Sequence, residues 1–489
     1  MITRLKDLLF TNRSAKQTIV KNVFWLSMSQ IGSRLIRAAI IIYAARVLGA
    51  AEYGIFSYVL SFAGFFTLFS DIGVNSLLTR NASSDPERKN EYFSNSFFIK
   101  IVLLLITVLL VIFVAPHFTN IEKAKVLIPF IAFLVVFDGI RDFSIAYLRG
   151  MEKMQIEAIL IIIMNTTIMI AGFIILYFST TSKALLLSYI VSVGITAILA
   201  TIILRKKYLE IFKYFNKKLI CETLNSCWPI AFSGMIGVFM LNTDIVMLGW
   251  WRGAEEIGYY SAGQRIIQVL YTLPVLLATA TFPALSKIIK QKDWQKEKLL
   301  NEKSIATVFF ITTPMIVGGI VLANSIFKLV FGEEYLPGVP AFQILTITLI
   351  TMSLGTILSN LILAHNQQKK ILGYIAAGSL GNIVFNALLI PPFGIIGSAI
   401  ATLCAQLVNY GPMWHKVKKI NNFYTFRHLK KIIASAAIMG ISAFFINKLG
   451  VNVLLNIIIS AGVYLIAIYL LKEKILKDII SLSQKVKTP

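Results

Sequence analysis

Charged residues, and acidic residues above all, are scarce in this sequence of 489 residues. They make up 14% of the chain against 57% hydrophobic residues, and 23 Asp and Glu stand against 47 Lys and Arg. Soluble domains of ordinary size cannot bury that much apolar surface, so most of it must face lipid. Strands that alternate apolar and polar residues are not seen either. The composition therefore predicts a helical membrane protein.

Residues for metal, redox and nucleotide chemistry are equally few. The three cysteines, Cys221, Cys227 and Cys404, lack metal-ligand spacing, and the four histidines have no nucleophile and carboxylate arranged beside them. A phosphate-binding glycine loop is also missing. We therefore expect no enzymatic activity, no metal and no cofactor, with Na⁺ or H⁺ coupling left open.

Apolar runs of about 20 residues, enough for a helix to cross about 30 Å of hydrocarbon, recur along the chain. We expect about fourteen transmembrane helices. Lys and Arg gather in alternate connections, with about 35 on the side that holds both tails and about 6 on the other. The positive-inside rule then predicts that both termini are cytoplasmic.

A short motif occurs twice, as "EYGIFS" at 52–57 and "EIGYYS" at 256–261. Each copy follows a long apolar run, and the offset of about six helices puts both copies the same way up in the membrane. We therefore expect two pseudo-symmetric six-helix lobes with a cavity between them, followed by two further helices. The predicted divisions are a cytoplasmic amphipathic N-terminus (1–22), an N-lobe (23–222), a C-lobe (223–427), and helices thirteen and fourteen with a cytoplasmic tail (428–489).

The net charge of +24 is divided among short loops and is not gathered into one domain. This distribution indicates a topology signal and attraction to a bilayer with anionic headgroups. Nucleic-acid binding, which such a basic chain otherwise suggests, is disfavoured.

Two arginines interrupt the first apolar run, in "SQIGSRLIRAAIII" (29–42). Arg34 and Arg37 share a helix face with Gln30, because the spacing is three and four residues. Arg34 lies about 18 Å into the expected span (23–48), where a charge is costly unless it meets a wet cavity or a partner. We favour substrate binding; the alternative is pairing with a carboxylate such as Asp71 or Asp142 to hold helices together.

Other spans carry polar stripes of the same kind. Arg265 and Gln268 lie in the eighth (257–286), where an interhelical hydrogen-bond stripe is the alternative to a binding role. In the fourth span (126–149), Arg141 lies within one turn of Asp138 and Asp142, so this group is either part of the cavity or a self-neutralising ion cluster.

Three aspartates within spans are candidates for ion coupling or for counter-ions to the arginines. They are Asp71 in the second span (53–78), Asp142 in the fourth and Asp244 in the seventh (223–250). Each can counter an arginine, carry a proton or bind Na⁺, and the residue type alone does not choose among these roles.

The stretches "ARVLGAAEYGIFSY" (45–58) and "FSDIGVNSLLTR" (69–80) resemble bacterial polysaccharide flippases of the O-antigen transporter type. Their superfamily, the multidrug/oligosaccharidyl-lipid/polysaccharide exporters, also contains multidrug exporters of the MATE kind and the lipid II flippase. Further resemblance lies in "LNTDIVMLGWWRGAEEIGYYSAGQRI" (241–266), "FGEEYLPGVPAFQIL" (331–345) and "PPFGIIGSAIATL" (391–403). The likeness covers nearly the whole chain.

This resemblance implies transport of a polyprenyl-pyrophosphate-linked oligosaccharide from the inner to the outer leaflet of a bacterial plasma (inner) membrane. It further implies a cationic cavity in which Arg34, Arg37 and Arg265 occupy places comparable to cavity arginines of lipid II flippases, and other polysaccharide-assembly membrane proteins as partners. A lipid II-type or multidrug exporter is the alternative within the superfamily. A membrane glycan polymerase or ligase is disfavoured, because every external connection is short and no acid–base group stands in a site.

Overall fold

The computed structural model describes residues 15–424 and 426–473, and within these residues every regular element is a helix. The chain divides into two compact units, Met1–Gly258 and Tyr259–Pro489. Each unit is described separately below as unit 1 and unit 2. The N-lobe boundary at residue 222 is a prediction about transmembrane lobes, and it stays a prediction.

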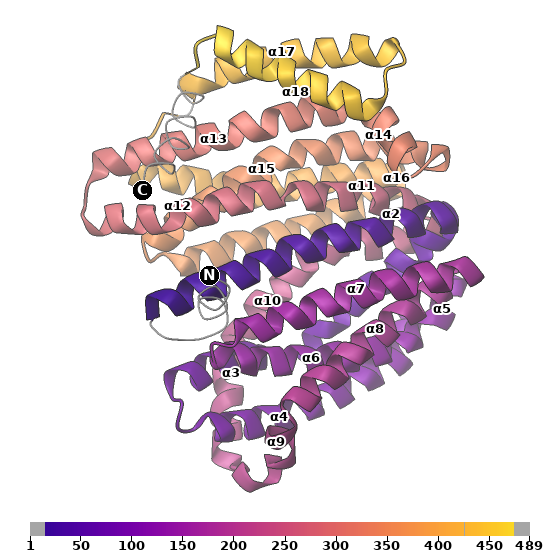
Figure 1. Ribbon diagram of the computed structural model, residues 1–489, viewed down its shortest axis with the longest axis vertical. Helices are drawn as coiled ribbons and strands as arrows, with labels where there is room; N and C mark the ends of the chain where they lie inside the picture. The colour runs from indigo at the N-terminus through magenta and orange to yellow at the C-terminus, as the bar shows by residue number, and fades with distance from the viewer. Residues whose placement is uncertain (1–14, 425, 474–489) are drawn as a thin grey trace, which may run out of the picture. The chain divides into compact units, whose positions relative to one another are not determined.

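Unit 1 is built around long helices that lie side by side, as Figure 1 shows for α7 and α8. Its first helix, α2, runs from Ala15 to Ser70 and turns at Gly49, where the backbone is not helical (φ 72°, ψ 172°). The remaining helices are α3 (Val74–Ser84), α4 (Lys89–Leu109), η1 (Leu110–Val114), η2 (Ala115–Phe118), α5 (Glu122–Leu127), η3 (Ile128–Phe130), α6 (Ile131–Gly150), α7 (Met154–Phe178), α8 (Ser182–Ile203), α9 (Arg205–Leu209), η4 (Ile211–Tyr214), α10 (Lys217–Trp251) and the start of α11 (Ala254–Leu270).

Unit 2 holds the rest of α11 and the helices that follow it. They are α12 (Thr272–Lys290), α13 (Trp294–Val321), α14 (Ala323–Val330), η5 (Glu333–Gly338), α15 (Val339–Ala364), α16 (Gln368–Ile420), α17 (Phe426–Lys448) and α18 (Val453–Leu470). The pair α17 and α18 packs against α13 (Figure 1). The expected eighth span (257–286) is therefore two helices, because the helix ends at Leu270 and restarts at Thr272.

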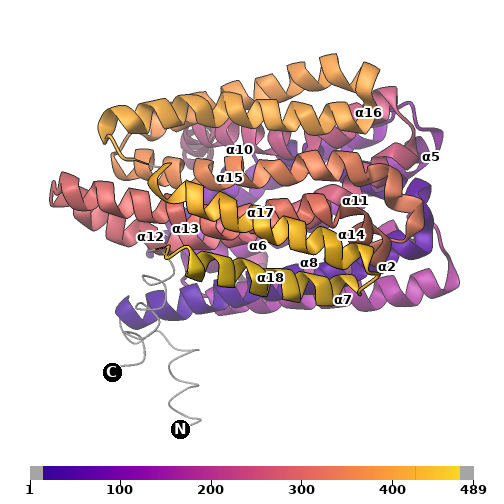
Figure 2. The same ribbon diagram turned by 90° about the horizontal axis from the view of Figure 1, so that it is seen from above.

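The 53 residues of α16 would extend about 80 Å if the helix were straight, far more than a bilayer needs. The chain reverses at Gly394 (φ 56°, ψ −133°), in a backbone region that glycine alone enters readily. The two arms then pack closely, since a Cβ added at Gly378 would lie 2.6 Å from the Cβ of Asn409. Figure 2 shows the long helices of this unit from above.

Eight helices of the described residues are long and apolar enough to cross a membrane, or up to ten if two bent helix pairs are each one span. In seven of these eight helices, fewer than half of the residues in the most apolar part are buried, from 28% in Lys89–Phe118 to 44% in Glu333–Ala364, whereas Ser182–Ile203 reaches 56%. This exposure fits helices that face lipid. The predicted all-α membrane fold is confirmed, and about fourteen spans are consistent with α2 and α16 each holding two arms.

The second expected span (53–78) is broken, because α2 ends at Ser70 and α3 starts at Val74 with a bend of 50°. A broken helix exposes carbonyl oxygens and N–H groups that need partners. The buried Lys100 of α4 donates from its Nζ to the carbonyl oxygen of Ser70 at 2.6 Å. The backbone N–H of Asn75 donates to Oδ1 of Asp71 at 3.2 Å, so this aspartate supplies an acceptor for the first turn of α3.

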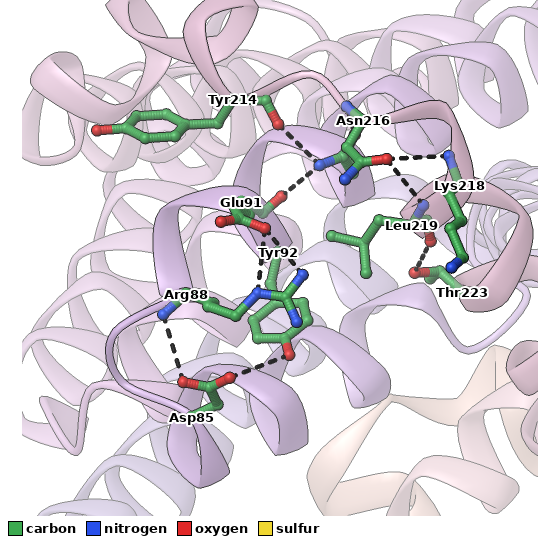
Figure 3. Close-up of polar contacts among 10 residues, drawn as sticks. Asp85, Arg88, Glu91, Tyr92, Tyr214, Asn216, Lys218, Leu219 and Thr223 are labelled. Atoms are coloured by element: carbon green, nitrogen blue, oxygen red, sulfur yellow. Dashed lines mark hydrogen bonds and ion pairs between the residues drawn. The ribbon is translucent and has the colours of Figure 1, made fainter.

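The basic connection between α8 and α10 is folded against α4. The side-chain amide of Asn95 donates to the carbonyl of Tyr214 at 2.9 Å, and the backbone N–H of Asn216 donates to Oδ1 of Asn95 at 2.7 Å. Asn216 also caps α10 by accepting from the N–H of Lys218 at 3.0 Å (Figure 3). The connection is therefore held against α4 by hydrogen bonds between the Asn95 side chain and backbone groups of residues 214 and 216.

The two copies of the repeated motif meet each other inside unit 1. A Cβ added at Gly54, in the first copy, would lie 1.8 Å from the carbonyl oxygen of Ala254. Reciprocally, a Cβ at Gly258, in the second copy, would lie 2.0 Å from the carbonyl oxygen of Ala50. Only glycine allows two helix backbones to approach so closely. The glycine of the motif is thus required by this crossing of α2 and α11.

We expect Gly54→Ala and Gly258→Ala each to lower the stability of the protein by about 1–3 kcal/mol or more, because the added methyl group would overlap a backbone carbonyl. Gly462→Ala in α18 is the matched control, since a Cβ there meets nothing within 4 Å. Thermal unfolding of the three purified variants in one detergent measures the difference. Equal midpoints for all three would show that the crossing tolerates a methyl group.

Candidate functional site

A pocket of about 360 Å³ lies within unit 1, between α2, α6 and α7. Each of these helices contributes four residues to its lining. These are Gln30, Ser33, Arg34 and Arg37 from α2; Arg141, Asp142, Ile145 and Arg149 from α6; and Glu157, Ile161, Met164 and Asn165 from α7. Its volume falls at the lower end of the range for small-molecule sites, about 300–1,000 Å³.

The α2 wall carries the polar face expected from the sequence. Gln30, Arg34 and Arg37 are spaced by four and three residues, so one side of the helix presents all three to the pocket. The Nε of Arg37 donates to Oδ1 of Asn165 at 3.0 Å, and the amide of Asn165 donates in turn to the carbonyl of Ile161 at 2.8 Å. Asn165 is neutral, so this contact orients the Arg37 guanidinium without cancelling its charge.

Arg141 is the centre of an ion cluster on α6. Its guanidinium lies 2.6 Å from a carboxylate oxygen of Asp138 and 2.7 Å from one of Asp142, and it also contacts the sulfur of Met164. The Arg141 side chain is 10% exposed, whereas that of Asp142 is 52% exposed. The local cluster that the sequence left as an alternative for Arg141 is thus present, and the same arginine lines the pocket.

The pocket is bounded, at the end next to the turn between α6 and α7, by a second ion pair. The Nε of Arg149 donates to Oε2 of Glu157 at 2.7 Å, and its Nη2 pairs with the other carboxylate oxygen. Arg149 lies in the last turn of α6 and Glu157 in the first turn of α7, the helix ends at which each charge is favourable.

Sequence reasoning missed Arg149, Glu157 and Asn165. A signal for Arg149 is its spacing of eight residues from Arg141, which places both arginines on one face of α6. Asn165 directly follows the apolar run 158–164, and an intramembrane amide usually has a partner. Glu157 carries no such pattern, because a charge close to a helix end is normal.

The charges of the lining do not cancel. Four arginines stand against two carboxylates, Asp142 and Glu157, which leaves a formal charge of +2. Counting Asp138 as well, which pairs with Arg141 from outside the lining, leaves +1. Guanidinium groups offer planar pairs of N–H donors that match phosphate and carboxylate oxygens, so this arrangement suits an anion.

The other predicted site residues are not among the residues that line this pocket. Arg265 and Gln268 lie on α11 in unit 2, where Nη1 of Arg265 donates to Oε1 of Gln268 at 3.2 Å. Asp71 accepts from the N–H of Asn75 in the first turn of α3, and Asp244 is buried in α10. Ion coupling through Asp71, Asp142 or Asp244 stays a prediction. No group of three or more His, Cys, Asp or Glu side chains that could hold a metal occurs among the described residues.

Comparison with known proteins identifies the family. A family model described as "Polysaccharide biosynthesis protein" matches residues 19–289, which is more than half of the chain, and one described as "Lipid II flippase MurJ" matches residues 253–464. The chain belongs to the polysaccharide biosynthesis protein family. It is a multi-pass membrane protein, and the resemblance to this exporter superfamily is confirmed.

Individual relatives are distant but span nearly the whole chain. The "Probable low-salt glycan biosynthesis flippase Agl15" of Haloferax volcanii is 21% identical over 92% of this chain and 92% of its own. The "Capsular polysaccharide biosynthesis protein CapF" of Staphylococcus aureus is 24% identical over 82% of this chain and 100% of its own. Among solved structures, the inward closed lipid II flippase MurJ shares the fold with a TM-score of 0.77 at 19% identity, covering 93% of this chain and 100% of that one.

The ion cluster around Arg141 should be needed for stability. Arg141→Ala removes the partner of Asp138 and Asp142, and breaking its mostly buried pair with Asp138 is expected to cost about 3 kcal/mol. Gln30→Ala, on the exposed face of α2, should change stability by about 0.5 kcal/mol or less. Thermal unfolding in one detergent compares them. If Arg141→Ala unfolds at the same temperature as Gln30→Ala, the cluster is not structural.

Proposed function

We propose that this protein is a flippase for a polyprenyl-pyrophosphate-linked oligosaccharide, the repeat unit of an O-antigen or another surface polysaccharide. It moves this lipid from the cytoplasmic to the outer leaflet of the plasma membrane by alternating access, with both termini in the cytoplasm. The observation that carries the proposal is the pocket in which four arginines from three helices converge. The names of its relatives, a glycan biosynthesis flippase and a capsular polysaccharide biosynthesis protein, point the same way.

The chemistry of the substrate requires such a pocket. A headgroup with many hydroxyls and two phosphates cannot enter hydrocarbon without the cost of unpaired polar groups and charges. A polar pocket with positive charge removes that cost, while the polyprenyl tail stays in the lipid that surrounds the helices. The volume of about 360 Å³ suits the diphosphate and the adjoining part of the sugar, and a complete oligosaccharide needs more room.

Within this proposal Arg34 and Arg37 bind the pyrophosphate. Both line the pocket from α2, and Arg37 donates from its Nε to Oδ1 of Asn165 at the pocket wall. Gln30 supplies an amide for phosphate or sugar oxygens on the same face, and Arg141 adds charge from within its ion cluster. Arg265 and Gln268 belong to the proposal because they follow the second copy of the repeated motif.

A lipid II-type substrate is the second candidate. The MurJ family model covers residues 253–464, and the MurJ structure shares the fold. Both candidates carry a polyprenyl pyrophosphate, so the pocket serves either one and the attached sugar decides between them. A cation-drug exporter fits less well, since the lining carries a formal charge of +2 and would repel a cationic ligand.

Transport in reconstituted vesicles tests the role of the α2 arginines. Arg34→Ala and Arg37→Ala should each slow flipping of a fluorescent polyprenyl-pyrophosphate-linked disaccharide about tenfold or more, because each removes charge-assisted bonds to phosphate. Lysine at either position should restore part of the rate, since it keeps the charge and loses the planar fork. An impermeant quencher measures how much lipid has reached the outer leaflet.

Arg80→Ala, an exposed arginine of α3 outside the pocket, is the control and should leave the rate unchanged. Vesicles are matched for the amount of folded protein, so a loss of abundance is not counted as a loss of transport. Wild-type rates in both α2 alanine variants would contradict the proposed site.

A further inference from the structure

Arg149 and Glu157 differ sharply in their exposure although they form one ion pair. The Glu157 side chain is 0% exposed, whereas the Arg149 side chain is 46% exposed. Both residues line the pocket. Arg149 therefore neutralises a buried carboxylate and at the same time keeps an open side in the lining of the pocket. A ligand in the pocket can reach this open side.

The geometry of the pair leaves part of the guanidinium unused. Arginine has five N–H donors, and Glu157 takes one from Nε and one from Nη2 along a single edge. Among the described residues, the structure assigns no acceptor to the two Nη1 hydrogens of Arg149. One of these hydrogens, together with the second hydrogen on Nη2, forms the end-on fork that can bond two oxygens of a phosphate.

Glu157 fixes the orientation of this fork. The Glu157 carboxylate accepts from Nε and Nη2 on one edge of the guanidinium and so holds the guanidinium plane in one position. The edge that carries Nη1 then points away from the carboxylate. Because Glu157 is buried in the first turn of α7, it cannot follow the arginine outward without exposing an unpaired charge to an apolar surrounding.

The same carboxylate reduces the positive charge that an incoming anion meets. A transporter has to release what it binds, and differences in affinity among variants of one site appear mainly in the dissociation rate. An arginine with a fixed counter-ion offers directional hydrogen bonds at lower electrostatic affinity than an arginine without one. This combination suits a site that is loaded and emptied in every cycle.

We propose that Arg149 is a further contact of this pocket for the diphosphate of the substrate, and that Glu157 is its positioning residue, which orients the fork and keeps binding weak enough for release. The inference rests on the proposed function, because it concerns the same anion in the same pocket. By its place beside the α6–α7 turn, Arg149 is the contact that the diphosphate meets at that end of the pocket, with Arg34 and Arg37 further along α2.

Binding of inorganic pyrophosphate to the full-length purified protein, measured by calorimetry, tests the two roles. Arg149→Ala should weaken binding about tenfold or more, and Arg149→Lys should weaken it less. Glu157→Gln should tighten binding about threefold, since a unit of negative charge is lost near the anion, and should slow flipping in vesicles. A purely structural pair predicts lower stability in this variant and no gain in affinity.

Two further sets of variants keep the test decisive. Arg149→Ala alone leaves Glu157 buried without a partner, so the double variant Arg149→Ala with Glu157→Gln is made as well. This double variant should bind pyrophosphate as weakly as Arg149→Ala does, and its abundance should be normal. Arg88 and Glu91 form a pair through the same guanidinium atoms, with Nε and Nη2 at 3.1 and 2.9 Å from Oε2, outside the pocket (Figure 3). Arg88→Ala and Glu91→Gln should leave pyrophosphate affinity unchanged.

The outcomes separate this inference from the proposed function. One outcome is that the wild type binds pyrophosphate, that Arg34→Ala weakens this binding, and that the double variant at 149 and 157 binds like the wild type. In that case the role of Arg149 is wrong, and the proposed binding pocket is still supported. Unchanged or weaker binding in Glu157→Gln overturns the role of Glu157. If the wild type does not bind pyrophosphate at all, the proposed function fails and the inference fails with it.

Discussion

Four arginines line one pocket between helices that are otherwise mostly apolar. The free-energy cost of removing their charges from water explains which side chains lie beside them. Charges within a membrane protein are tolerated where they meet a partner or a wet cavity. Arg141 and Arg149 are met by carboxylates at hydrogen-bonding distance, and Arg37 is met by the amide of Asn165. Since the acidic residues of the lining are fewer than the arginines, the pocket keeps a positive balance.

These contacts also tie the three helices of the pocket together. The bond from Arg37 joins α2 to α7, and the pair of Arg149 with Glu157 joins α6 to α7 across their connecting turn. Lys21 makes a further link, from the start of α2 to the side-chain oxygen of Gln155 at 3.0 Å. The polar groups proposed to bind the substrate therefore also make the contacts between the helices that line the pocket. Under the proposed function, substrate binding is coupled to the packing of these helices.

Much of the fold and part of the site could be predicted from the sequence because they rest on periodicity. Spacing by three and four residues places Gln30, Arg34 and Arg37 on one helix face, and they line one pocket. Asp138 and Asp142 lie within one turn of Arg141, so their pairing needs no knowledge of the fold. The repeated E-x-G motif was visible as well, although its physical basis, the reciprocal contact of Gly54 and Gly258 with facing carbonyls, comes from the structure.

What could not be predicted depends on contacts between distant segments. Lys100 and Ser70 are 30 residues apart, and the break they stabilise lies inside an apolar run that reads as one continuous span. Arg149 and Glu157 each lie near a helix end, where charged residues usually serve topology and are common in the sequence. The hydrogen bond from the N–H of Asn75 to Asp71 likewise depends on the break before α3, which the sequence does not show.

The central claim, that the substrate diphosphate enters the pocket between α2, α6 and α7, is tested most directly by photocrosslinking from the wall of that pocket. Benzoylphenylalanine is placed at Gln30, which lines the pocket, and in a second variant at Met28, which is exposed on the same helix outside the lining. The account predicts crosslinking of radiolabelled lipid-linked oligosaccharide from position 30, reduced by excess inorganic pyrophosphate, and little from position 28. Equal crosslinking from both positions, unaffected by pyrophosphate, would contradict it.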